Sequence, residues 1–168
     1  LPCGDTAQTL KIDDFQSAPV VEGWQTSTAV NFVARAFPCV RYHHTDAPAL
    51  AAMAKMLRSL YLHREIREKG GAYGGFALYN PEEGLFALGS YRDPHIARTL
   101  AAFDGARDFM AGGGYTDEDI DEAVLQVCAD IDKPDAPGTM GRKAFFRRLV
   151  GLSDAARREF KTRLLALD

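Results

Sequence analysis

The sequence is poor in the residues that build metal centres and disulfide frameworks. It has only three cysteines, Cys3, Cys39 and Cys128, and no C-x-x-C pair. An odd number of scattered cysteines supports neither a disulfide framework nor a zinc knuckle. The four histidines form neither H-E-x-x-H nor its inverse H-x-x-E-H, the spacings that place two zinc-binding imidazoles on one helix face. We therefore predict no metal site within this chain.

Motifs for a catalytic nucleophile and for nucleotide binding are also missing. There is no G-x-S-x-G sequence, and no cysteine has a convincing histidine partner in sequence. The glycine-rich stretch 70–75 has the composition of a phosphate-binding loop, but it runs from a predicted helix into a predicted strand. Phosphate loops run from strand to helix, so that the helix N-terminus faces the anion. This order argues against a nucleotide site.

Long hydrophobic runs are absent as well. The sequence contains no signal peptide and no run of about 18 apolar residues, so it predicts no membrane contact. Unpaired thiols favour a reducing compartment, and a cytoplasmic location is the expectation. The chain starts at Leu1 rather than at a methionine, which suggests a fragment. An organellar or periplasmic targeting segment of the parent protein could then lie upstream.

Charge is unevenly distributed along the chain. The formal net charge is −3, yet residues 139–168 contain eight Lys/Arg and three Asp/Glu, a local charge of +5, which leaves −8 for the rest. This pattern predicts either contact between the basic end and an acidic neighbour or simply solvated helix faces. We expect no nucleic-acid binding, because no aromatic-interleaved or groove-reading motif accompanies these residues. They are Arg142, Lys143, Arg147, Arg148, Arg157, Arg158, Lys161 and Arg163.

The length and composition fit a single domain, 1–168, with an ordinary hydrophobic content of 46%. Residues 1–17 form a polar, weakly structured lead-in, and residues 18–168 form the folded body. The stretch 18–38 is expected to be extended. Within it a strand has one apolar face, which includes Phe32, and one mixed face, which includes Val33 and Arg35.

The remaining residues alternate between helical spacing and a hairpin pattern. Helices are expected from the Asp46 cap to the Gly70-Gly71 stop, from Ile96 to Met110, from the Thr116 cap to Ile131, from Thr139 to Val150 and from the Ser153 cap to Leu167. A hairpin with strands 72–78 and 85–91 lies between the first two helices. This order favours an α+β fold with an antiparallel sheet packed on one face by α-helices.

The junction between the first helix and the hairpin carries the strongest candidate site. Arg67 falls in the last helical turn and Tyr73 at the start of the strand, with two glycines between them that allow the chain to reverse. Such a pair can bind a peptide carbonyl, a carboxylate or a phosphate. It is also explained without function, because arginine is favoured at a helix C-terminus and tyrosine is common in strands.

The two glycines that follow Tyr73 also have two interpretations. Gly74 and Gly75 leave the strand without side chains, so an extended peptide could approach and add to it as a further strand. The same glycines could instead mark a bend or bulge of the sheet.

Four motifs of the chain together resemble a known family. They are LHREIREKGGAYGG at 62–75, SYRDP at 90–94, DIDEA at 119–123 and GLSD at 151–154. In this order they resemble the C-terminal domain of presequence proteases, which are pitrilysin/insulinase-type zinc metallopeptidases of the inverzincin group. The resemblance covers the chain from about Val20 to its end.

The resemblance implies a peptidase built from two halves that close around a chamber and degrade short unstructured peptides. Zinc and H-x-x-E-H would lie in the N-terminal half, so the partners of this chain would be the peptide substrate and the N-terminal catalytic domains. By the same resemblance, Tyr73 would stabilise the oxyanion, and Arg67, Gly74 and Gly75 would contact the substrate. The isolated chain is predicted to be inactive.

Two points stay open at the level of sequence. Where this chain has Phe76, relatives tend to carry a third glycine; the phenylalanine could narrow the substrate channel or fill the core. The alternative function is a non-catalytic scaffold or peptide-binding module of the same fold. Retention of both Arg67 and Tyr73 counts against that alternative.

Overall fold

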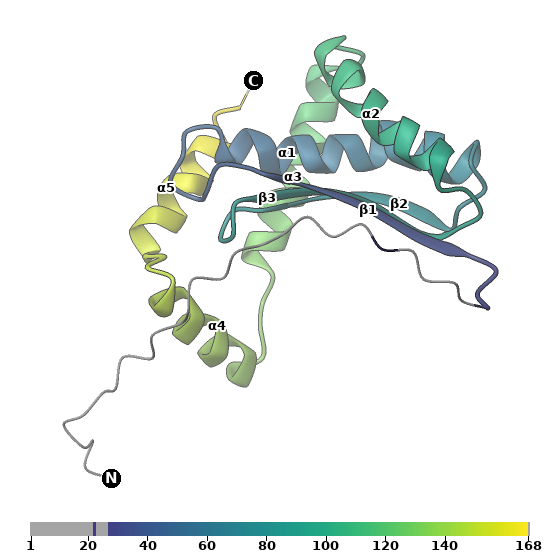
Figure 1. Cartoon of the computed structure of the whole chain (residues 1–168). Helices are drawn as coiled ribbons and strands as arrows, with labels where there is room; N and C mark the ends of the chain where they lie inside the picture. Colours follow the sequence, from purple (N-terminus) through teal and green to yellow (C-terminus); the bar gives the residue numbers. More distant parts are fainter. Residues whose placement is uncertain (1–21, 23–26, 168) are drawn as a thin grey trace.

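The described part of the chain has an α+β fold with a three-stranded antiparallel sheet; the fold class and the antiparallel sheet are those that the sequence predicts. The computed structural model describes residue 22 and residues 27–167; the expected lead-in 1–17 lies outside them. The elements in chain order are β1 (Asn31–Pro38), α1 (Ala47–Met56), η1 (Leu57–Glu68), β2 (Gly74–Asn80), β3 (Leu85–Asp93), α2 (Ala97–Ala111), α3 (Asp117–Asp132), α4 (Pro137–Leu149) and α5 (Asp154–Leu164). The sheet order is β1-β3-β2, with both pairs antiparallel (Figure 1).

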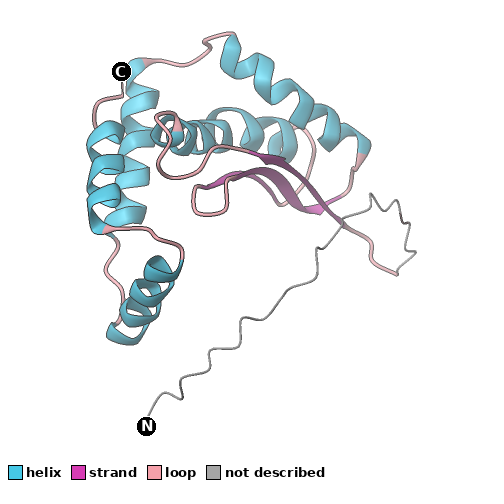
Figure 2. Ribbon diagram, turned by 60° about the vertical axis from the view of Figure 1, so that its left-hand side comes forward, coloured by secondary structure: helices cyan, strands magenta, loops and turns pink. Residues whose placement is uncertain are grey.

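The helices that contact the sheet lie on one side of it, which confirms the predicted layering. The α1–η1 rod and α2 lie against this face, and α3 and α5 pack against α1 (Figures 1 and 2). Leu62, Ile66 and Leu164 are among the most deeply buried side chains of the core between these elements. Helix α4 stands away from the sheet, and none of its side chains is buried. No helix in the part of the chain that the structure describes is long and apolar enough to cross a membrane.

Strand β1 buries the mixed face and exposes the apolar one. Val33 is buried, and Arg35 reaches Asp104 of α2 in an ion pair. On the opposite face Phe32 is 74% exposed. The face of β1 that carries only apolar residues therefore points away from the helices, and the mixed face, with Val33 in the core and Arg35 paired to α2, points toward them.

The long helix predicted between Asp46 and Gly70-Gly71 exists, but its second half is not α-helical. Residues 57–68 form a π-helix, in which hydrogen bonds close five residues back. The bond from the Lys69 N–H to the Arg64 carbonyl, at 2.9 Å, has this spacing. Helical periodicity alone predicts an α-helix here, and that prediction is wrong for this half.

The predicted helix starts are largely confirmed. Thr116 and Asp119 form the reciprocal capping box of α3, and Ser153 Oγ accepts a hydrogen bond from the Ala156 N–H at the start of α5. Asp46 is the N-cap of α1, although its side chain makes no capping hydrogen bond. The hairpin strands begin at Gly74 and end at Asp93, each two residues later than the expected boundary.

Candidate functional site

The turn between η1 and β2 is held by backbone hydrogen bonds that require glycine. The Gly71 N–H donates to the Arg67 carbonyl at 2.9 Å, and the Ala72 N–H donates to the Ile66 carbonyl at 3.1 Å. Gly71 has a φ of +76°, a left-handed conformation that glycine adopts without penalty. A Cβ on Gly70 would lie 2.4 Å from the Ile66 oxygen. The chain therefore reverses in the space of two residues, as the sequence indicated.

This reversal places Arg67 and Tyr73 next to each other. The Arg67 guanidinium carbon lies 5.9 Å from the centroid of the Tyr73 ring, within cation–π range. The Tyr73 side chain is 58% exposed, and its hydroxyl makes no hydrogen bond within the described part of the chain. The phenol is thus fixed by its ring while its O–H remains available as a donor.

Two further residues that the sequence did not single out hold the Tyr73 ring. The Arg92 guanidinium carbon lies 5.7 Å from its centroid, and the Tyr91 ring centroid lies 5.3 Å from it. Arg92 sits at an irregularity in the β1–β3 register and has a φ of 51°. A left-handed arginine is uncommon and carries strain, which a surrounding structure must hold. Both residues lie in the motif SYRDP, but nothing in that motif reveals a positive φ.

Asp93 fixes the backbone immediately after Arg92. Its buried carboxylate accepts hydrogen bonds from the His95 N–H at 2.8 Å and the Thr99 hydroxyl at 2.6 Å. Burial alone would raise the pKa of Asp93, but hydrogen bonding to the ionised form outweighs it and the pKa is lowered. Ser90 is buried beside the same carboxylate, yet its hydroxyl falls short of hydrogen-bond geometry; the bonds from Thr99 and His95 therefore carry the effect.

Tyr73 and Arg67 open onto a groove of about 610 Å³ beside strand β2. The groove is bounded by β2, by the exposed side of η1 and by Gln126 of α3. Strand β2 is an edge strand within the described residues, because β3 pairs with only one side of it. The unpaired side of an edge strand presents N–H and C=O groups to an incoming chain. The groove thus combines a cation, a phenol and an open strand edge.

Gly74 and Gly75 both line this groove, but their missing side chains have partners within the chain. A Cβ on Gly74 would lie 2.6 Å from the Tyr91 ring, and a Cβ on Gly75 would lie 3.1–3.2 Å from Ile66 and the Leu62 carbonyl. Tyr91 and η1 therefore fill the space that the sequence left open for another backbone. What remains open at these glycines is the edge of the strand, not its faces.

Phe76 does not fill the core. Its side chain lies on the face away from the helices, is 37% exposed, and covers Gly89, where a Cβ would lie 2.3 Å from the ring. The ring also lines the groove. Of the two readings left open for Phe76, a wall of the groove is the one that matches the structure.

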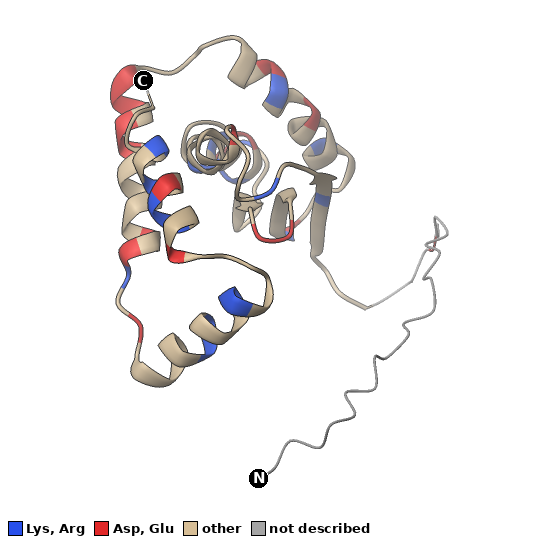
Figure 3. Ribbon diagram, turned by 90° about the vertical axis from the view of Figure 1, so that its left-hand side faces the viewer, with Lys and Arg blue, Asp and Glu red and all other residues tan. Residues whose placement is uncertain are grey.

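The basic C-terminal region is partly neutralised by the chain's own carboxylates. Lys143 pairs with Asp135 at 2.7 Å and Lys161 with Asp132 at 2.5 Å, so the end of α3 and the loop after it supply acidic partners. Helix α4 carries basic but no acidic residues (Figure 3). The prediction of an acidic neighbour is therefore met in part within this domain.

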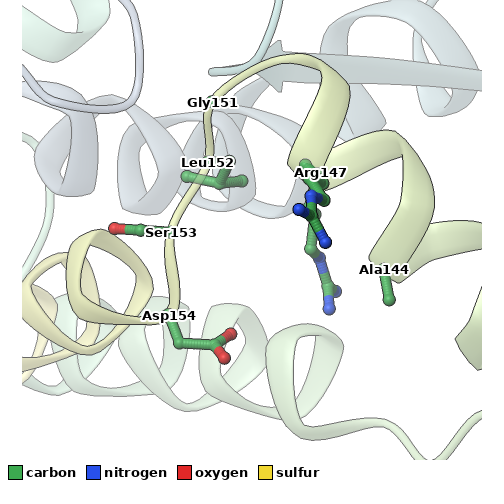
Figure 4. Close-up of a pocket in the computed structure, with 7 residues that line it drawn as sticks. Ala144, Arg147, Gly151, Leu152, Ser153 and Asp154 are labelled. Atoms are coloured by element: carbon green, nitrogen blue, oxygen red, sulfur yellow. The ribbon is translucent and has the colours of Figure 1, made fainter.

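A second recess lies at the α4–α5 turn, and its lining explains the GLSD motif. Gly151 has a φ of +72°, Leu152 is buried, and Ser153 caps α5 (Figure 4). These roles are structural. The recess, of about 390 Å³, also contacts Arg147 and Arg148. Asp154 on its rim pairs with Arg157.

The described residues contain no candidate metal centre. Among residues 22 and 27–167, no three His, Cys, Asp or Glu side chains lie close enough together to hold an ion. His63 instead lies 3.3 Å from Glu68, and Cys39 and Cys128 are free thiols.

Comparison with known proteins identifies close relatives. A family model described as the PreP C-terminal domain matches residues 22–168. The chain is 41% identical over 138 residues to the mitochondrial presequence protease of Danio rerio and 40% identical over 139 residues to that of Mus musculus. These alignments cover 82% and 83% of this chain but 13% of each relative. The chain thus spans about an eighth of the length of these curated relatives.

Solved structures share the fold at low sequence identity. A protease from Helicobacter pylori aligns with a TM-score of 0.69 at 19% identity, covering 86% of this chain and 36% of that one. A peptidase M16 inactive domain from Pseudomonas fluorescens aligns with a TM-score of 0.58 at 16% identity, covering 80% and 34%. At these identities the likeness establishes the α+β fold alone.

Proposed function

Because the chain belongs to the PreP C-terminal domain family, we propose that it is the substrate-binding domain of a zinc metalloendopeptidase that degrades short unstructured peptides. The observation that carries this proposal is the convergence of Arg67 and Tyr73 on one groove beside the open edge of β2. An extended peptide has the matching shape, because it can add to the edge strand through main-chain hydrogen bonds.

The two side chains divide the work by their chemistry. Tyr73 presents a free O–H on a ring that is held on several sides, so it can donate to a carbonyl oxygen that gains negative charge during hydrolysis. A preorganised donor of this kind stabilises the transition state more than the ground state. Arg67 contributes a charge-assisted hydrogen bond to a substrate carbonyl or carboxylate and so positions the peptide. Gly74 and Gly75 offer their edge-facing main chain to the same peptide.

The metal and the general base are assigned to the N-terminal half of a larger protein, which is the partner of this domain. Two facts support this assignment: the described residues contain no metal cluster, and the curated relatives are about eight times as long as the aligned segment. Those relatives are named as mitochondrial proteins. For this chain, the cytoplasmic and organellar locations both remain predictions.

The test is the removal of one oxygen atom from the parent enzyme. Tyr73→Phe keeps the ring and its contacts with Arg67 and Arg92, and we expect it to lower kcat on a quenched peptide by about 10²–10³-fold with little change in KM. Tyr115→Phe is the matched control, because its hydroxyl makes no hydrogen bond among the described residues and lies outside the groove. Unchanged kcat for Tyr73→Phe would remove the catalytic role.

The same peptide-hydrolysis assay distinguishes the proposed enzyme from the alternative function. A scaffold or peptide-binding module would bind peptides without hydrolysing them, with or without added zinc. Chelator-sensitive hydrolysis by the isolated 168-residue chain would also contradict the proposal, since it would require a metal site within this chain.

A further inference from the structure

The π-helical geometry of η1 brings together cationic residues that an α-helix would separate. Arg58 and Arg67 are nine residues apart, which is about two and a half turns of an α-helix, so they would lie on opposite sides. A helix with bonds five residues back needs roughly one more residue per turn, so nine residues make about two turns. Arg58, His63 and Arg67 accordingly all line the groove beside β2.

Two of the cations in this groove have no ionic partner. Lys55 is paired with Asp130 at 2.6 Å, and His63 lies 3.3 Å from Glu68. Arg58 and Arg67 make no ion pair within the described residues, and both side chains are exposed. Among the residues that the structure describes, no aspartate or glutamate lines the groove. The groove therefore carries two positive charges, on Arg58 and Arg67 of η1, that no carboxylate among the described residues neutralises.

We propose that Arg58 is a specificity-determining residue that binds a carboxylate of the peptide held in this groove. This inference rests on the proposed peptide-binding function of the groove and adds to it the class of peptide selected. A guanidinium binds a carboxylate through two parallel charge-assisted hydrogen bonds, which is stronger and more directional than its contact with a neutral carbonyl.

The spacing of the two arginines sets the position of that carboxylate. Nine helical residues rise at most about 13 Å, and an extended peptide covers this length in about four residues at roughly 3.3 Å each. The selected carboxylate thus lies about three or four residues from the group that Arg67 contacts. It can be an acidic side chain or the C-terminal carboxylate of a short peptide, and the two sources are separated by experiment.

Equilibrium binding to the full-length protein, with chelator present, tests the proposal without requiring turnover. Fluorescein-labelled ten-residue peptides carry glutamate or glutamine at successive positions, and each has a C-terminal acid or amide. We expect one glutamate position, or the free C-terminus, to tighten Kd by about tenfold or more over its neutral counterpart. Arg58→Gln should abolish this preference, so that the acidic and neutral peptides bind with the same Kd.

The controls use the same helix and the same change of charge. Arg64→Gln removes an arginine that pairs with Glu65 and does not line the groove, and it should keep the preference. Arg58→Glu should reverse it, so that a lysine peptide binds more tightly than the glutamate peptide. Equal binding of acidic and neutral peptides by the wild type, binding of neither, or a preference retained in Arg58→Gln would each overturn the proposal.

Hydrolysis is then measured on the same peptides after the chelator is removed. Loss of the acidic preference in Arg58→Gln, with acidic and neutral peptides both still hydrolysed, would support both the inference and the proposed enzymatic function. An Arg58-dependent preference in binding without any hydrolysis would support the inference and contradict the proposed enzymatic function. Failure of the inference about Arg58 can therefore be distinguished from failure of the proposed enzymatic function.

Discussion

Substitution of Asp93 by asparagine tests the claim that a buried carboxylate holds the corner around Tyr73. The Asp93 side chain is 1% exposed and accepts two hydrogen bonds, from the His95 N–H and the Thr99 hydroxyl. It follows directly after the left-handed Arg92, which stacks on the Tyr73 ring. The carboxylate therefore ties strand β3 to helix α2 at the point where the strained residue needs support.

The expected loss of unfolding free energy in Asp93→Asn follows from the hydrogen-bond donors and acceptors at this site. Asparagine keeps one oxygen for the His95 N–H but turns an amide N–H₂ toward Thr99. The Thr99 hydroxyl can then rotate to the His95 carbonyl, which is 2.9 Å away, and accept from the amide. About one charge-assisted hydrogen bond is lost, so we expect unfolding of the 168-residue chain to become easier by about 2 kcal/mol. Asp93→Ala leaves both donors unpaired and should cost about 4 kcal/mol.

The pH dependence of the difference in unfolding free energy between wild type and Asp93→Asn tests the role of the carboxylate more sharply than its value at pH 7. The pKa of Asp93 is lowered in the folded state, so its ionised form stabilises the fold above the unfolded value of about 3.9. This contribution is lost as the pH falls below that value and through the folded pKa. The difference in unfolding free energy between wild type and Asp93→Asn should therefore shrink as the pH is lowered from 5 toward 3.

Urea denaturation followed by far-ultraviolet circular dichroism at pH 7, 5 and 3 measures this difference. Asp104→Asn is the matched control: Asp104 forms an ion pair with Arg35, but its side chain is 68% exposed, so it should cost no more than about 1 kcal/mol. A difference for Asp93→Asn below about 0.5 kcal/mol at pH 7, or one that stays constant down to pH 3, would refute the reasoning.

Two further substitutions probe the geometry of the groove. Gly75→Ala would place a Cβ 3.1–3.2 Å from Ile66 and the Leu62 carbonyl, so it should destabilise the chain by about 1–3 kcal/mol in urea denaturation; a neutral result would mean that η1 and β2 can separate freely. Arg92→Gly should relieve the left-handed strain and raise the unfolding free energy by about 1 kcal/mol. It should also weaken peptide turnover by the parent enzyme through loss of the contact with Tyr73, and turnover equal to wild type would show that this contact has no role.

Much of the fold follows from local signals in the sequence. The Thr116 and Ser153 caps and the left-handed Gly71 are each specified by neighbouring residues, and the structure confirms them. The juxtaposition of Arg67 and Tyr73 belongs to this group, since only six residues separate them. Features of this kind can be read from sequence because their causes lie within a few positions of each other.

The features that sequence analysis missed depend on contacts between distant segments. Nothing near Phe32 and Val33 tells which face of β1 the helices cover, and the answer depends on α2, whose Asp104 accepts the polar Arg35. The positive φ of Arg92 likewise depends on pairing with β1 and on the turn into α2. Tertiary context overrides local pattern at both sites.

The π-helix is different, because its cause does lie in the local sequence. The buried residues are spaced five and then four positions apart, and a search for α-helical spacing does not recognise this pattern. The buried residues of η1 are Leu57, Leu62 and Ile66, separated by five and then four positions. On an α-helix the first and last of these would lie on opposite sides, and one of them would leave the core. The basic residues Arg58, His63 and Arg67 repeat the same spacing one position later. The geometry that buries the first set therefore also directs the second into the groove, so core packing alone is enough to align the two unpaired arginines beside β2.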